Sequence, residues 1–113
     1  MVNQAYVPRR GDVVWLNFTP QAGHEQAGRR PAVVISPATY NGKSGLALFC
    51  PITNQNKGYP FEVPLPDDLP ATGVALVDQI KSLDWRVRRV EFLCTLPNTT
   101  LDEIFRKLKT LVQ

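Results

Sequence analysis

The fold of this chain is organised around the stretch Gly23-His24-Glu25-Gln26-Ala27-Gly28-Arg29-Arg30-Pro31-Ala32-Val33-Val34-Ile35-Ser36-Pro37. Its first half is a polar loop bounded by two glycines. Its second half is a short apolar run between two prolines, which is typical of a buried strand. Because Pro31 fixes the backbone where the strand begins, Arg30 is held at the junction of loop and strand. A permanent cation there suits an anion-binding site, although a plain surface arginine beside a strand has the same pattern.

On both sides of this stretch, short apolar runs separated by turn residues predict further strands. We expect strands at residues 13–18, 32–36, 46–52, 61–63, 74–80 and 85–94, and helical turns near 39–40 and 82–85. An apolar stripe after Pro97 predicts one C-terminal helix, with Thr100 and Glu103 as its capping box. This pattern predicts a mainly β fold, a small antiparallel β-barrel with a C-terminal helix.

The predicted hairpin brings two polar residues together that are far apart in the sequence. If strands 32–36 and 46–52 pair around the turn at 37–45, Arg30 and Thr53 face each other about 5 Å apart at Cα, as opposed antiparallel residues do. Arginine offers a planar fork of donors to phosphate oxygens, and threonine offers one hydroxyl. The alternative for Thr53 is a turn hydroxyl that bonds its own backbone.

The composition restricts the class of protein. The chain has 113 residues, of which 43% are hydrophobic, so we expect one packed domain over residues 1–113. A net charge of +3 permits a polyanionic partner without requiring one. No apolar run reaches membrane-spanning length and no signal-peptide pattern is present, so we expect a cytoplasmic protein. Cys50 and Cys94 lie in apolar runs and are expected to be buried free thiols.

Several chemistries have poor support in the sequence. There is one histidine and no Cys-x-x-Cys, and the acidic residues lack metal-ligand spacing, so we expect no metal and no cofactor. Phosphate-cradling and dinucleotide-binding glycine motifs are missing as well. A serine-type triad would need His24, which has no obvious nucleophile at a fixed spacing. We interpret His24 as a solvated loop residue.

Four segments carry a resemblance to a known family: Gly11-Asp12-Val13-Val14-Trp15, the run from Glu25 to Val34, Lys57-Gly58-Tyr59-Pro60-Phe61-Glu62-Val63, and Asp78-Gln79-Ile80-Lys81-Ser82-Leu83-Asp84-Trp85-Arg86. In this order they resemble the MazF/PemK family, the mRNA interferase toxins of type II toxin–antitoxin systems. The resemblance covers nearly the whole chain. It implies an SH3-like barrel of the MazF/Kid/CcdB type.

The resemblance also implies a reaction and its residues. It implies a sequence-specific, metal-independent endoribonuclease, in which the 2′-OH of RNA attacks the adjacent phosphorus and leaves 2′,3′-cyclic phosphate and 5′-OH ends. The family's catalytic arginine and threonine fall on Arg30 and Thr53, and its loop acid falls on Glu25. Arginine stays protonated and is a poor base. Glu25 therefore either orients Arg30 or accepts the 2′-OH proton, or it is only a loop salt bridge.

Candidate RNA-binding residues come from the resemblance and from side-chain chemistry. The resemblance places Asn54, Gln55 and Lys57 in a loop beside the site, and it places base contacts at a strand end. Amide and carboxylate side chains read base edges, lysines hold phosphates, and aromatic rings stack on bases. The alternative for Asp78 and Lys81 is a surface ion pair. The full candidate set is Phe18, His24, Arg29, Asn54, Gln55, Lys57, Asp78, Gln79, Lys81 and Ser82.

The resemblance implies a homodimer and a cognate antitoxin whose acidic, extended tail covers the RNA channel. Two other functions fit the same fold. One is a CcdB-like gyrase-binding toxin, which acts through a C-terminal Trp-Gly-Ile, whereas this sequence ends Thr110-Leu111-Val112-Gln113. The other is a non-catalytic SH3-like interaction module, which would bind through aromatic residues and cleave no RNA.

Overall fold

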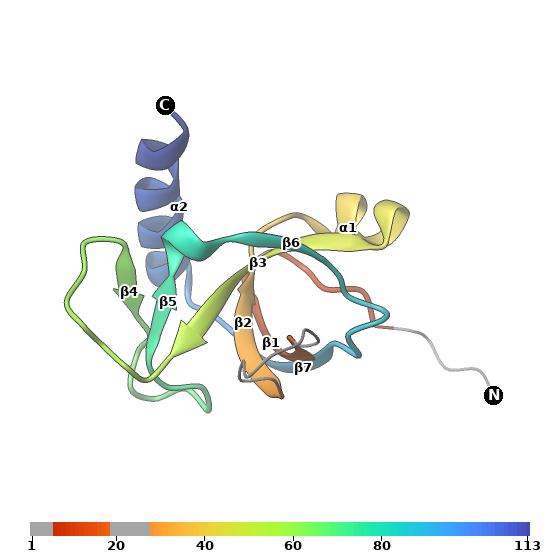
Figure 1. Cartoon of the computed structure of the whole chain (residues 1–113), viewed down its shortest axis with the longest axis horizontal. Helices are drawn as coiled ribbons and strands as arrows, with labels where there is room; N and C mark the ends of the chain where they lie inside the picture. Colours follow the sequence, from red (N-terminus) through yellow and green to blue (C-terminus); the bar gives the residue numbers. More distant parts are fainter. Residues whose placement is uncertain (1–5, 19–27) are drawn as a thin grey trace.

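The structure is a computed structural model, and it describes residues 6–18 and 28–113. Figure 1 shows strands wrapped between two helices, with α2 beside β4 and α1 at the opposite end. The elements in order are β1 (Asp12–Asn17), β2 (Arg29–Val34), α1 (Ala38–Ser44), β3 (Leu46–Thr53), β4 (Glu62–Pro64), β5 (Val74–Leu76), the 3₁₀ turn η1 (Val77–Gln79), β6 (Lys81–Asp84), β7 (Glu91–Thr95) and α2 (Asn98–Val112).

The sheet is antiparallel at each recorded pairing, as predicted. Its strand order is β4-β5-β3-β2-β1-β7, and β6 branches from β3. The long strand β3 pairs with β6 near its start, with β2 in its middle and with β5 at its end. In the part of the chain that the structure describes, β4 and β7 do not pair, so the sheet is not closed as a complete barrel would be.

Residues 77–95 differ from the sequence prediction. The expected strand at 74–80 ends at Leu76, and Val77–Gln79 form the turn η1. The expected helical turn at 82–85 is the strand β6, and the expected strand at 85–94 is a tight turn followed by β7. The Asp84 carboxylate accepts hydrogen bonds from the backbone N–H groups of Arg86 and Val87, at 3.0 and 3.1 Å. Arg89 has a positive φ of 55°, which reverses the chain. A side-chain cap therefore interrupts the continuous strand that was predicted at 85–94.

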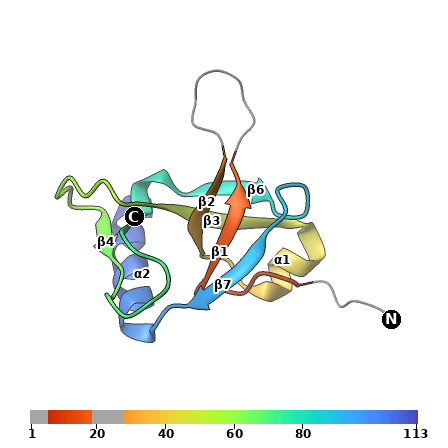
Figure 2. The same cartoon turned by 90° about the horizontal axis from the view of Figure 1, so that it is seen from below.

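Two apolar clusters lie on the two faces of the sheet. One contains Val13, Val33 and Cys50 and packs against Ile104 of α2. The other contains Leu16, Ala32, Val34, Phe49 and Trp85. Burial raises the pKa of the Cys50 thiol to about 12, with a smaller contribution from Asp78. Both cysteines are free thiols, as predicted, but only Cys50 is buried, and Cys94 is half-buried. Figure 2 shows β1, β2 and β3 crossing between the regions of α1 and α2.

The C-terminal helix begins earlier than its sequence predicts. It starts at Asn98, directly after Pro97, and no side chain caps it, so the predicted capping box at Thr100 and Glu103 is wrong. The Thr100 N–H instead bonds the Pro97 carbonyl within the first turn. The predicted apolar stripe is confirmed in the middle of the helix, where Ile104 is buried and Phe105 and Leu108 pack against the same cluster, whereas Leu111 and Val112 at its end are exposed. Of the helices in the described ranges, none is long and apolar enough to cross a membrane.

Candidate active site

The register between β2 and β3 is the one that the sequence predicts. The paired residues are Ala32 with Pro51, Val33 with Cys50 and Val34 with Phe49. When this register is continued by two residues along each strand, Arg30 lies opposite Thr53. The recorded ladder stops at Pro51, which has no N–H to donate. Arg30 also pairs with Leu16 of β1. Its half-buried side chain therefore starts from a strand that is held on both sides.

Thr53 is fixed at the last position of β3. It pairs with Val74, and its hydroxyl oxygen accepts a hydrogen bond from the Gln55 N–H at 3.1 Å. The alternative prediction for Thr53, a hydroxyl that bonds the backbone of its own turn, is thus observed. The hydroxyl only accepts in this bond, so its proton can still be donated. Gly73 packs so closely that an added Cβ would lie 2.3 Å from the Thr53 carbonyl oxygen. The position of Thr53 therefore depends on a glycine at position 73.

Lys81 and Phe18 come together on the same face as Arg30. The Lys81 Nζ lies 5.8 Å from the centroid of the Phe18 ring. Phe18 packs against the cluster that contains Leu16 and Phe49, and Lys81 pairs directly with Phe49. Because opposed residues in an antiparallel pair share a face, Lys81 projects from the side that carries Arg30. A cation and an aromatic ring thus lie on the same face of the sheet as the arginine.

The other RNA-binding residues that were predicted near Lys81 are exposed. Asp78 and Gln79 lie in η1, and Ser82 pairs with Leu48 on the opposite face of β6 from Lys81. Within residues 6–18 and 28–113, Asp78 and Lys81 do not form the surface ion pair that was considered as their alternative role. The same residues contain no group of three acidic, histidine or cysteine side chains placed to hold a metal ion. The predicted residues His24 and Glu25 lie outside the described residues.

The loop at 54–59 is exposed, and a buried glutamate holds it. Asn54, Gln55 and Lys57 are exposed, as RNA contacts must be. The Glu62 carboxylate accepts hydrogen bonds from the backbone N–H groups of Lys57 and Gly58, at 3.1 and 2.9 Å. Glu62 was not predicted as a functional residue, since the sequence placed it only in a short strand at 61–63. The available signal was a charged residue between two apolar ones in a segment bounded by prolines.

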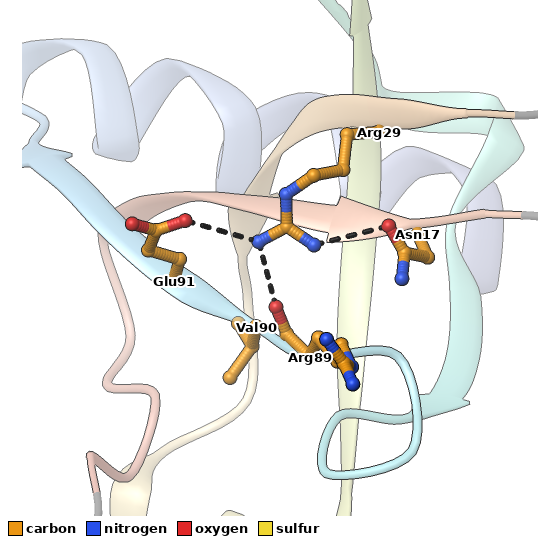
Figure 3. Close-up of a pocket in the computed structure, with 5 residues that line it drawn as sticks. All are labelled: Asn17, Arg29, Arg89, Val90 and Glu91. Atoms are coloured by element: carbon orange, nitrogen blue, oxygen red, sulfur yellow. Dashed lines mark hydrogen bonds and ion pairs between the residues drawn. The ribbon is translucent and has the colours of Figure 1, made fainter.

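Arg29 lies on the opposite face from Arg30. Its guanidinium donates to the Asn17 side chain at 3.0 Å, to the Arg89 carbonyl at 2.7 Å and to Glu91 at 3.2 Å (Figure 3). These residues and Val90 line an open pocket of about 500 Å³. Arg29 thereby ties the start of β2 to β1 and β7. The pocket is separate from the face that carries Arg30 and Lys81.

Comparison with known proteins identifies the family. A family model described as the PemK-like, MazF-like toxin of type II toxin–antitoxin systems matches residues 9–112. This chain belongs to that family. The resemblance noted in the sequence is therefore confirmed.

Two kinds of relative show how close the match is. The endoribonuclease toxin MazF of Escherichia coli K12 is 49% identical over 107 residues, which cover 95% of this chain and 96% of that relative. Crystal structures of MazF and of a MazE-MazF complex from Deinococcus radiodurans are each 58% identical to this chain, and each covers 96% of it. Their TM-scores are 0.88 and 0.90, and the match spans 98% and 97% of those chains. The fold is thus of the MazF type, although its sheet is not closed.

Proposed function

We propose that this protein is an endoribonuclease toxin that cleaves single-stranded mRNA at a short sequence motif, without a metal ion, and that a cognate antitoxin neutralises it. Endoribonuclease activity follows from its membership of the family and from 49% identity to the MazF toxin of Escherichia coli. The single observation that carries the chemistry is the register of β2 and β3, which, continued two residues beyond the pair of Ala32 and Pro51, sets Arg30 opposite Thr53. Lys81 and Phe18 support it from the same face.

The proposed reaction uses a nucleophile that the RNA itself supplies. The 2′-oxygen attacks the adjacent phosphorus, the bond from phosphorus to the 5′-oxygen breaks, and the products are a 2′,3′-cyclic phosphate and a 5′-OH. The 2′-OH gives up one proton and the leaving 5′-oxygen gains one. Arg30 stabilises the charge that develops on the phosphorane oxygens, and the Thr53 hydroxyl donates to the same group. Glu25 orients Arg30 or takes the 2′-OH proton.

RNA binding is assigned by side-chain chemistry and exposure. Lys57 and Lys81 hold phosphates, and the exposed face of Phe18 stacks on a base. Side chains with amide, carboxylate or hydroxyl groups read base edges. These are Asn54, Gln55, Asp78, Gln79 and Ser82, and each of them is exposed. His24, which precedes β2 in the sequence, and Arg29 complete the proposed set. Arg29 is the first residue of β2, and it projects from the face opposite to Arg30, where it bonds Asn17, Arg89 and Glu91.

The proposed partners follow from the family. A MazE-MazF complex is known for the Deinococcus radiodurans protein. We therefore assign this chain a cognate antitoxin, whose acidic, extended tail would meet the cations of the RNA face. We further propose that the chain is one toxin domain, that it acts as a homodimer and that it works in the cytoplasm, where mRNA is found.

End mapping of RNA separates this function from its alternatives. The protein is incubated with a mixed-sequence RNA in excess EDTA, and the 5′ and 3′ ends of the products are determined. The proposal predicts cuts at one short motif, with 5′-OH and cyclic phosphate ends, which disappear when the antitoxin is added. A gyrase-binding toxin or an interaction module would leave the RNA intact. Cleavage that stops with EDTA would contradict the metal-independent mechanism.

A further inference from the structure

We propose that Glu62 is a positioning residue that holds the RNA-contacting loop at 54–59 in its binding conformation and thereby sets the affinity of the enzyme for its cleavage motif. The inference rests on the proposed function, because it assigns that loop to RNA binding. It concerns a residue that would itself touch no RNA. Glu62 is the first residue of β4, and its side chain is only 7% exposed.

The bonds of Glu62 are directed at the loop. One carboxylate oxygen, Oε2, accepts from the Lys57 N–H at 3.1 Å, and the other, Oε1, accepts from the Gly58 N–H at 2.9 Å. A carboxylate only accepts hydrogen bonds, so it suits two neighbouring backbone donors. Hydrogen bonds to a charged group are also stronger than those between neutral groups. The backbone beneath the Lys57 side chain is therefore fixed from inside the protein.

Other contacts hold the second half of the loop and the segment that follows it. The Asn56 side chain also accepts from the Gly58 N–H, at 2.9 Å. Gly58 has φ +74°, a conformation that other residues rarely adopt. On the far side, the Lys107 ammonium of α2 donates to the carbonyl oxygens of Pro60 and Glu62, at 2.6 and 3.2 Å. Glu62 is thus the central anchor of a loop that is otherwise exposed.

A loop that is ordered before RNA binds affects RNA affinity more than it affects the chemical step. Ordering a loop when RNA binds costs conformational entropy, and a loop that is already ordered avoids this cost. The catalytic pair lies outside the loop, since Arg30 is on β2 and Thr53 ends β3. Loosening the loop should therefore raise KM and leave kcat nearly unchanged, as loss of uniform binding does. If Glu62 had only a structural role, its substitution would lower stability but would not raise KM while leaving kcat unchanged.

The test uses the full chain and an RNA oligonucleotide that carries the mapped motif. Glu62→Gln keeps the shape of the side chain but turns an N–H₂ group toward one of the two backbone donors. KM should rise about tenfold, the size of losing one hydrogen bond to a charged group, with kcat unchanged within about twofold. Asp102→Asn makes the same carboxylate-to-amide change at an exposed site on α2 and should leave KM unchanged.

A second variant guards against poor folding of Glu62→Gln. Asn56→Ala removes the other acceptor of the Gly58 N–H from an exposed position, and it should raise KM about threefold, in line with loss of a neutral hydrogen bond. In the double variant the rise should exceed the product of the two single effects, because either acceptor alone still holds that N–H.

The outcomes separate this inference from the proposed function. If the unmodified protein cleaves no RNA, the proposed function itself fails. If it cleaves, the inference is overturned when folded Glu62→Gln keeps its KM, when it loses kcat alone, or when Asp102→Asn raises KM equally. If Glu62→Gln does not fold, an unchanged KM in Asn56→Ala overturns it.

Discussion

Arg29 and Arg30 are neighbours in the sequence but lie on opposite faces of β2. Arg29 pairs with Asn17 and is bonded to Glu91 and to the Arg89 carbonyl, whereas Arg30 pairs with Leu16 on the face that carries Lys81. Side chains alternate along a strand, so the two positions have different surroundings although their side chains are identical. One arginine cross-links three strands, and the other is directed to the candidate active site.

This difference predicts separate outcomes for two substitutions. Arg30→Ala should lower kcat about a hundredfold or more, the scale of losing one transition-state donor. Its melting temperature should stay close to that of the unmodified protein, because a half-buried strand-end residue leaves no large core cavity. Arg30→Lys should restore little, since a point charge does not replace a bidentate fork. Arg106→Ala, at an exposed arginine of α2, is the control for loss of charge.

Cleavage kinetics and thermal unfolding measured on the same preparations check this prediction. Cleavage by a well-folded Arg30→Ala protein at a rate near that of the Arg106→Ala control would contradict the assignment of Arg30.

The sequence was sufficient to predict the central hairpin and its register. Apolar runs on each side of the turn at 37–45 determine which residues pair, because Val33 and Val34 pack into clusters on opposite faces of the sheet and a slip by one residue would move each into the wrong cluster. The opposition of Arg30 and Thr53 follows from that register. The resemblance to the MazF/PemK family supplied the function, which composition and charge alone did not.

The sequence was insufficient where side chains cap the backbone. Trp85-Arg86-Val87-Arg88 alternates as a strand does, but the carboxylate of Asp84 closes a turn there. Glu62 was missed for a related reason. Acidic residues are seldom buried, and its two donors are backbone groups that sequence patterns do not reveal. The pairing of Lys81 with Phe18 likewise depends on β6 being a strand, which was not predicted.

Gly73 should control the position of Thr53. Its φ is +113°, and an added Cβ would lie 2.3 Å from the Thr53 carbonyl oxygen. Gly73→Ala should destabilise the fold by about 1–3 kcal/mol, through backbone strain and displacement of Thr53, and should lower kcat. Gly28→Ala is the matched control, because Gly28 has φ +102° but no atom within 4 Å of its added Cβ. Denaturant unfolding that gave equal losses for both variants would refute the proposed clash.

Lys81 should contribute to RNA affinity through charge. Lys81→Gln should weaken binding of a single-stranded RNA and reduce the slope of log K against log salt by about 0.7, the value for one phosphate contact. Lys109→Gln, on the exposed side of α2, should leave the slope unchanged. Affinity titrations at several salt concentrations measure both. An unchanged slope in Lys81→Gln would remove Lys81 from the phosphate contacts.

The thiol of Cys50 should be inert in the folded protein. Its pKa is raised to about 12, so at pH 8 about one thiol in ten thousand is thiolate, and the reactive form grows as pH rises toward that pKa. The test uses Cys94→Ser, which leaves Cys50 as the single cysteine. Alkylation at pH 8 should be slow in buffer and rapid in denaturant. Equal rates in the two conditions would show that Cys50 is not held in a closed core.

The central claim is that the RNA supplies the nucleophile and that Arg30 and Thr53 stabilise the group it attacks. The most direct measurement compares two oligonucleotides that carry the mapped motif, one all-ribose and one with a single 2′-deoxy sugar at the cleaved position, in excess EDTA. The account predicts that the first is cut to cyclic phosphate and 5′-OH ends and that the second binds but stays intact. Cleavage of the 2′-deoxy substrate at the same position would contradict it.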